Sequence, residues 1–381
     1  MEPVVSRTVW IGLALWLSVV SSFGQAPSER KPLLSEQAFK NVQVLKGIPV
    51  DQFMATMGFI SASLGETCTD CHIGESGGSW ARYADDTPRK RTAGRMMTMV
   101  SAINRTYFAG QRVLTCYSCH RGGDRPRITP SLAELYGPPH PEEPDQILTE
   151  GPGKPSVDQV LDRYIAALGG AQRLAEITSF SAKGTYKGFS DIDANPFELF
   201  AKAPNQRATI VHTPNGDSTS VYDGRAGWNA APPTDSPVPV LELTGGDLDG
   251  ARLDAELSFP AQIKQILKQW RVAYPAIIDD KDMQVLQGTT DGRYPVNLYF
   301  DSKSGLLARL VRYSDSPLGL SPTQIDYSDY REVSGVKMPF RSTVTWLDGR
   351  AIVQFNEVKA NTPIDAAKFG RPAPPAAPEK K

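Results

Sequence analysis

The chain has 381 residues, and 40% of them are hydrophobic, which is enough to form packed cores in two domains. Its 41 basic and 42 acidic residues leave a net charge of −1, so the totals indicate neither a nucleic-acid-binding protein nor an acidic-tail protein. Only four cysteines and four histidines are present, and all four cysteines and two of the histidines fall in two pentapeptides.

Residues 1–24 have the pattern of a secretory signal peptide. Arg7 precedes an apolar run from Val9 to Val20, and the small-residue segment Ser21–Gly24 follows it. The run is shorter than the ~20 residues that span a bilayer, so an uncleaved anchor is the weaker alternative. We predict cleavage after Gly24 and a periplasmic protein that associates with a membrane only through a partner.

Residues 34–125 predict an all-α domain, and residues 126–155 predict a stiff linker because they contain eight prolines. One helix is predicted over residues 51–65. A second is predicted to begin at Thr87-Pro88, since a threonine cap followed by proline favours a helix start.

Residues 156–369 predict an antiparallel β half-barrel with helices. Ser156 is a good N-cap for a helix over residues 157–168, and the hydrophobic period then changes from the helical value to two. Turn sequences separate the predicted strands at Asn215-Gly216, Asp223-Gly224, Ser304-Gly305 and Asp348-Gly349. A helical insertion is expected over residues 253–270, and residues 370–381 read as a disordered tail. The predicted fold class is therefore α+β.

The two pentapeptides share the form Cys-x-x-Cys-His, which is the signature of covalent c-type haem attachment. Their key residues are Cys68, Cys71 and His72 in the first copy and Cys116, Cys119 and His120 in the second. Two thiols one helical turn apart can each add to a haem vinyl group, and the adjacent imidazole then reaches the iron. Zinc binding or disulfides are the competing interpretations, but neither explains the histidines. We predict two covalently bound c-type haems.

A methionine-bearing segment precedes each motif and can supply the sixth iron ligand. Met57 lies 11 residues before Cys68, and Met96 lies 20 residues before Cys116, which leaves room for the chain to turn back. Met54 and Met99 are rivals one helical turn away, and Met97 is assigned to packing. His140 and His212 are assigned to linker solvation and strand packing.

The stretch from about Asn41 to Gly122 resembles the cytochrome subunit of photosynthetic reaction centres. The resemblance rests on the strings NVQVLKGIPVDQFMATM, CTDCH, RMMTMVSAIN and LTCYSCHRG. It implies iron ligation by Met57 with His72 and by Met96 with His120. It also implies electron transfer with a redox protein partner, for which a membrane-bound reaction centre or a respiratory complex is a candidate.

The β-rich part resembles the periplasmic lipoprotein-carrier fold, in which a curved sheet cups a helix. The most distinctive strings are YDGRAGWN and YREVSGVKMPF, and the concave face of such a fold can take an apolar ligand. We predict a dihaem electron carrier without catalytic residues. A dihaem enzyme such as a peroxidase is one alternative, and a ligand-binding protein with redox-sensing haems is another.

Overall fold

The computed structural model describes residues 31–73, 80–137, 155–290 and 294–375. The chain divides into two compact units, Met1–Lys31 and Pro32–Lys381, and all that follows concerns the second. The predicted signal peptide lies outside the described residues, as does the end of the predicted tail. Among the described residues, no helix combines the length and apolar character that crossing a membrane requires.

The N-terminal part of this unit is helical, as the sequence predicts. Thr87 caps the longest helix by accepting a hydrogen bond from the Lys90 N–H at 3.2 Å, and Gly65 ends the preceding long helix at a positive φ of 65°. The elements are α1 (Ser35–Ala38), α2 (Val50–Leu64), α3 (Cys68–Cys71), η1 (Ala81–Ala84), α4 (Pro88–Tyr107), α5 (Cys116–His120) and α6 (Leu132–Leu135).

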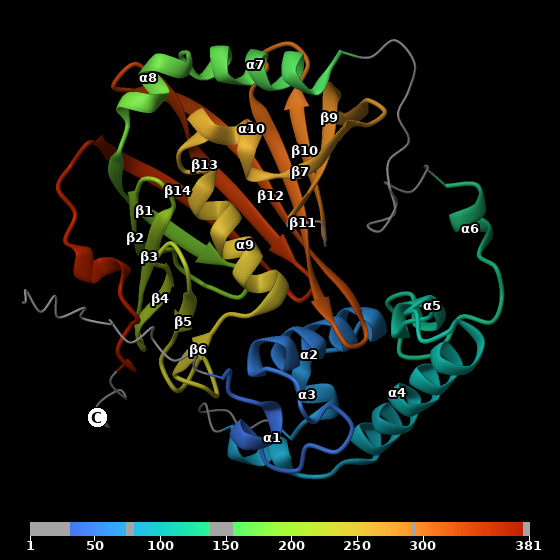
Figure 1. The fold of residues 1–381 in the computed structure, drawn as a ribbon. Coiled ribbons are helices and arrows are strands. Elements are labelled where there is room, and N and C mark those ends of the chain that lie inside the picture. Colours follow the sequence, from blue (N-terminus) through green and yellow to red (C-terminus); the bar gives the residue numbers. More distant parts are fainter. Residues whose placement is uncertain (1–30, 74–79, 138–154, 291–293, 376–381) are drawn as a thin grey trace, which may run out of the picture. The chain divides into compact units, whose positions relative to one another are not determined.

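The C-terminal part forms one antiparallel sheet of fourteen strands within the described residues (Figure 1). The strand order is β6-β5-β4-β3-β2-β1-β14-β13-β12-β11-β10-β9-β7, with β8 paired to β9. The bounds are β1 (Ser179–Gly188), β2 (Asn195–Lys202), β3 (Gln206–Thr213), β4 (Gly216–Tyr222), β5 (Gly227–Ala230), β6 (Val240–Glu242), β7 (Lys268–Val272), β8 (Ala276–Ile278), β9 (Lys281–Thr290), β10 (Tyr294–Asp301), β11 (Leu307–Ser316), β12 (Gly319–Val333), β13 (Val336–Trp346) and β14 (Gly349–Ala360).

All four predicted turns separate consecutive strands of this sheet. The sheet stays continuous because β1 pairs with β14, which joins the strands that begin the sheet to those that end the chain. A register shift occurs there at Gly184, where a Cβ atom would collide with the Gln354 carbonyl, so the close approach of the strands requires glycine.

Helices cover one face of the curved sheet (Figure 1). They are α7 (Val157–Leu168), α8 (Ala171–Glu176), α9 (Gly245–Glu256), η2 (Pro260–Gln262) and α10 (Ile263–Ile266), and η3 (Ala366–Phe369) follows the last strand. Helix α7 begins at the predicted cap, since the Ser156 hydroxyl accepts from the Gln159 N–H at 3.2 Å. Its Leu161 and Leu168 side chains pack in the core with residues of the sheet.

The helical insertion predicted over residues 253–270 is wrong in its extent. Helix α9 starts earlier, at Gly245, and ends at Glu256, and residues Lys268–Trp270 belong to strand β7. Pro260 interrupts the helical segment because proline has no N–H to donate and disfavours a helical residue before it. The apolar residues of this region therefore belong in succession to a helix, a short turn and an edge strand.

Helix α2 contacts the loops of the sheet. Asp51 accepts from the Thr244 hydroxyl at 2.9 Å and also from its N–H, so α2 provides a cap for the start of α9. The Phe59 ring lies against Gly319 at the start of β12, and the Trp80 indole donates to the Pro233 carbonyl at 3.0 Å. These contacts join segments that are more than 150 residues apart in sequence.

The carboxyl group of Asp247, in the first turn of α9, predicts that the folded state loses stability as pH rises from 4 to 6. Burial raises the pKa of Asp247 to about 6, the Asp51 carboxylate raises it further, and Arg312 and Ser314 oppose the rise. Because the folded-state pKa exceeds the unfolded value, the folded protein holds the extra proton at low pH, and this stability is lost as pH rises through 6. The shift corresponds to at most about 3 kcal/mol of unfolding free energy.

We therefore expect Asp247→Asn, which mimics the protonated acid, to unfold like the wild type at pH 4 and to be more stable at pH 7. Denaturant unfolding at both pH values measures the difference. Asp193→Asn in the exposed loop before β2 serves as the matched control. An equal effect of the two substitutions at pH 7 would contradict the assignment to Asp247.

Candidate functional site

Each Cys-x-x-Cys-His motif coincides with one short helical turn. The first motif forms α3, and His72 follows directly as its C-cap; the second motif forms α5. Residues three apart on a helix lie on the same side, so each pair of thiols faces one region of space. All four cysteines of the chain lie in the described part, and each is free, with Cys68 and Cys119 exposed and Cys71 and Cys116 partly exposed. In the described part of the chain, the four thiols are therefore not joined in disulfides.

The residues before each motif fix this turn in the same way. The Thr67 N–H donates to the Asp70 carboxylate at 2.7 Å, and the Thr115 N–H donates to the Ser118 hydroxyl at 3.0 Å. In each case the second variable residue of the motif reaches back to the threonine that precedes the first cysteine. The two motifs thus share a local cap as well as a sequence.

Both motif histidines have one ring nitrogen engaged by a backbone carbonyl. His72 Nδ1 lies 2.9 Å from the Tyr83 carbonyl oxygen, and His120 Nδ1 lies 3.0 Å from the Gly123 carbonyl oxygen. A carbonyl oxygen can only accept, so Nδ1 carries the proton and donates it. The lone pair is then left on Nε2, which is the arrangement of a metal-binding imidazole with its orienting partner. The residues present therefore fit an iron ligand at each motif.

Burial lowers the pKa of His72, and the positive charge of Lys90 acts in the same direction, while the hydrogen bond to Tyr83 opposes them. The neutral imidazole that a metal requires is favoured at this position. Lys90 also donates to the Tyr83 carbonyl, at 2.8 Å, so that oxygen accepts from two donors. The Tyr83 ring stacks on the His72 ring with centroids 4.9 Å apart, which restricts the orientation of the imidazole.

The predicted methionine ligands lie on the two long helices that contact the motifs. Helix α2, which carries Met57, contacts α5, and helix α4, which carries Met96, contacts both α3 and α5. Met57 is partly buried, whereas Met96 and its rival Met99 are 37% and 45% exposed. The structure brings the methionine helices to the motifs. The pairing of each methionine with a histidine stays a prediction.

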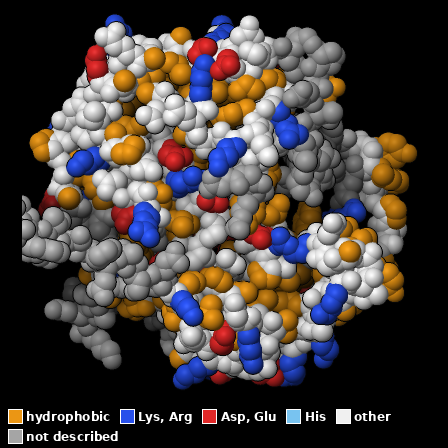
Figure 2. Space-filling view, in the orientation of Figure 1, with side chains coloured by type: hydrophobic (Ala, Val, Ile, Leu, Met, Phe, Trp, Pro, Cys, Tyr) orange, Lys and Arg blue, Asp and Glu red, His pale blue; other side chains and the backbone are white. Residues whose placement is uncertain are grey.

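Several large apolar side chains of the N-terminal helical part are exposed. They are Val44, Met96, Met99, Tyr107, Val113 and Tyr117. Figure 2 shows hydrophobic side chains over the N-terminal helices with Lys and Arg side chains around them. An apolar surface of this kind is typical of a site that a ligand or partner covers.

Several arginines of the N-terminal helical part are held in ion pairs. Arg89 lies 3.0 Å from Glu66, Arg91 lies 2.6 Å from Asp86, and Arg112 pairs with Asp315. His212 bonds to Asp217 at 2.7 Å within β3 and β4, which agrees with its assignment to strand packing; His140 lies outside the described residues.

Sequence reasoning missed the carbonyl partners of the histidines, Tyr83 and Gly123. A backbone oxygen has no residue-specific signal, and only the position of Gly123 three residues after His120 could have suggested a local turn. It also missed the contact between Asp51 and Thr244, because the two residues are 193 positions apart.

Comparison with known proteins confirms the resemblance of the N-terminal part. Residues 18–134 match the family model of the photosynthetic reaction centre cytochrome C subunit. A similar protein is the photosynthetic reaction center cytochrome c subunit of Thermochromatium tepidum, which is 36% identical over 97 residues. The match covers 24% of this chain and 23% of that relative, so the chain spans about a quarter of its length.

Solved structures similar to this chain include a LolA superfamily protein from Nitrosomonas europaea, with a TM-score of 0.40 and 16% identity over 57% of this chain and 98% of that one. Another is a putative outer membrane lipoprotein-sorting protein domain from Vibrio parahaemolyticus, with a TM-score of 0.39 and 10% identity over 55% and 94% of the two chains. Likeness at these TM-scores says nothing about what this chain binds.

Proposed function

We propose that this chain is a periplasmic c-type cytochrome that carries two covalently bound haems and passes single electrons. The observation that supports it most is the pair of free-thiol turns, each followed by a histidine whose Nδ1–H is held by a carbonyl oxygen. The match to an electron-carrying cytochrome family over residues 18–134 supports the same role.

In this proposal each residue of the site has a defined task. Cys68 and Cys71 hold one porphyrin by thioether bonds, and Cys116 and Cys119 hold the other. His72 and His120 would hold the two irons through Nε2, and Met57 and Met96 would supply the second protein ligand of each iron. When bound, haem iron cycles between its ferric and ferrous states. Two protein ligands on each iron leave no coordination position for a substrate, so the protein acts as a carrier and not as an enzyme.

The proposed partner is a redox protein, either a membrane-bound reaction centre or a respiratory complex. This follows the cytochrome family that the N-terminal part matches. Association of the protein with a membrane would then depend on that partner. The proposed signal peptide, the helical haem domain of residues 34–125, the linker of residues 126–155 and the tail belong to the same proposal.

Carbon monoxide distinguishes this function from the dihaem-enzyme alternative. We expect that the reduced, haem-loaded protein does not bind carbon monoxide rapidly, because each iron already has two protein ligands. Absorption spectra recorded before and after addition of the gas to the dithionite-reduced protein measure this. Rapid binding at one haem per chain would support a peroxidase-like enzyme instead.

A second candidate function, binding of an apolar molecule by the β-rich part, is favoured by a cavity of about 220 Å³ between the helices and the sheet. This volume exceeds that of the ~150 Å³ engineered cavity that stays dry and binds benzene. Among the described residues that line this cavity, none belongs to a Cys-x-x-Cys-His motif.

A further inference from the structure

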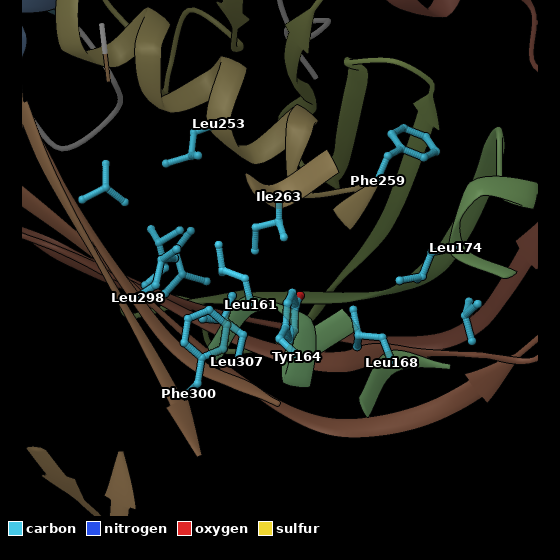
Figure 3. Close-up of a cluster of buried hydrophobic side chains, with 14 of the residues drawn as sticks. Leu161, Tyr164, Leu168, Leu174, Leu253, Phe259, Ile263, Leu298, Phe300 and Leu307 are labelled. Carbon is cyan, nitrogen blue, oxygen red and sulfur yellow. The ribbon is translucent and has the colours of Figure 1, made fainter. Parts of the chain in front are cut away.

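The cavity of the β-rich part is mostly apolar but has one charged end. Aromatic and aliphatic side chains from α7, α8 and the inner face of the sheet line most of it, including Phe180, Phe197, Leu199 and Phe355. Figure 3 shows Tyr164 and Leu168 of α7 and Phe259, which follows α9, within one cluster of buried side chains. Arg207, Asp254 and Arg312 line the same cavity and form its charged end.

The charged end has more hydrogen-bond donors than it satisfies. A guanidinium has five N–H donors, but among the described residues that of Arg207 makes a single hydrogen bond, at 3.4 Å to the Ser258 hydroxyl. Arg312 Nη2 donates to Asp254 Oδ2 at 3.2 Å, while Arg312 Nε and Asp254 Oδ1 are buried without a partner in the described part of the chain. The unused donors of Arg207 and Arg312 Nε outnumber the single unused acceptor, Asp254 Oδ1, so the cluster has room for a further acceptor-rich group.

The charges of the cluster indicate the sign of that group. Asp254 is the one acidic residue lining the cavity, and it is already bonded to Arg312, which also lies near Asp247 outside the cavity. Arg207 is therefore left without a carboxylate of its own. Arg207 is partly buried, and this burial lowers the pKa of its guanidinium, while Asp254 acts in the opposite direction. A cation that is partly withdrawn from water is stabilised when an anion accompanies it.

We propose that the cavity binds a single-chain amphiphile with a carboxylate headgroup, the carboxylate pairing with Arg207 and the hydrocarbon chain lying among the apolar lining. A carboxylate matches the planar fork of a guanidinium and carries the single negative charge that Arg207 lacks. A neutral headgroup would leave this cation uncompensated, and a cationic headgroup would be repelled. The inference rests on the proposal that the β-rich part binds an apolar molecule, and it specifies the class of that molecule.

Calorimetric titration of the full-length, haem-loaded and delipidated protein tests this inference with three probes of equal chain length. The probes are decanoate, decanol and decyltrimethylammonium, each below its micelle concentration. We expect decanoate to bind with one-to-one stoichiometry and at least tenfold more tightly than decanol, and the cationic probe to bind more weakly than either. Equal affinity for decanoate and decanol would overturn the headgroup inference while leaving the apolar site, and absence of binding by all three would overturn both.

Variants locate the headgroup within the cavity. We expect Arg207→Gln to reduce the affinity for decanoate to that for decanol without changing the latter. Arg341→Gln is the matched control, because Arg341 is an exposed arginine of β13 outside the lining. Leu199→Trp should abolish binding of both probes by filling the cavity. Circular dichroism and the haem absorption spectrum report whether each variant is folded. If Arg207→Gln does not fold, the affinities of the wild type for the three probes test the headgroup inference alone. An unchanged preference for decanoate in folded Arg207→Gln would contradict the proposal.

Discussion

Replacing both cysteines of the second motif with serine is expected to leave one covalently bound haem per chain instead of two. Cys116 and Cys119 occupy one helical turn, so both thioether bonds of that site depend on them, whereas Cys68 and Cys71 lie on a separate turn. The haem-to-protein ratio from absorption of the denatured protein in alkaline pyridine measures the loss. The intact mass after extraction with acid acetone measures it independently.

The control for this experiment is Tyr117→Phe, which changes an exposed residue between the two cysteines and leaves both thiols in place. It should retain two haems. The reciprocal replacement of Cys68 and Cys71 should also leave one haem, on the second motif. Retention of two covalent haems in either double variant would refute the attachment sites.

Replacing Met57 or Met96 with alanine is expected to leave one of the two irons without its methionine ligand in each variant. Loss of the thioether removes a ligand that favours the reduced state, so the potential of one haem should fall by on the order of 0.1 V, within the roughly 0.8 V that axial ligands span. The reduced variant should also bind carbon monoxide at about one of its two haems. Redox titration followed by absorption and the carbon monoxide difference spectrum provide the two measurements.

Met54→Ala and Met99→Ala are the matched controls, because each of these methionines lies one helical turn from a proposed ligand on the same helix. Both should keep the wild-type potentials and remain closed to carbon monoxide. If Met99→Ala binds carbon monoxide and Met96→Ala does not, Met99 replaces Met96 as the ligand on α4. The same comparison between Met54→Ala and Met57→Ala decides the ligand on α2.

The local elements of this fold could be predicted from the sequence. Ser156 and Thr87 cap helices because their hydroxyls satisfy backbone N–H groups three residues later, and this effect depends only on near neighbours. Strands β1 to β4, β10, β11, β13 and β14 were recognisable by their period of two and by the turns between them, whereas β5, β6, β8, β9 and β12 were not predicted. Strand β7 was not, because the run of apolar and polar residues up to Trp270 fits a helix as well as a strand, and pairing with β9 decides between them.

The site was predictable where covalent chemistry fixes the residue spacing, as it does for the cysteines and histidines of the two motifs. Features made by distant segments were not. The carbonyl oxygens that hold His72 and His120 belong to the backbone, and Arg207 reads in the sequence as an ordinary polar residue of a strand. Only the packing of α9 and the sheet around Arg207 shows that its guanidinium borders a cavity.

The contacts of α2 bear on how the protein can be dissected. A proteolytic cut before Ser156 would not liberate two self-sufficient fragments. The C-terminal fragment would lose the Asp51 acceptor of Thr244, and the N-terminal fragment would lose the surface at Gly319 on which the Phe59 ring rests. Each fragment would expose groups that the intact polypeptide keeps from solvent, so biochemical work on either half is best done with the whole polypeptide.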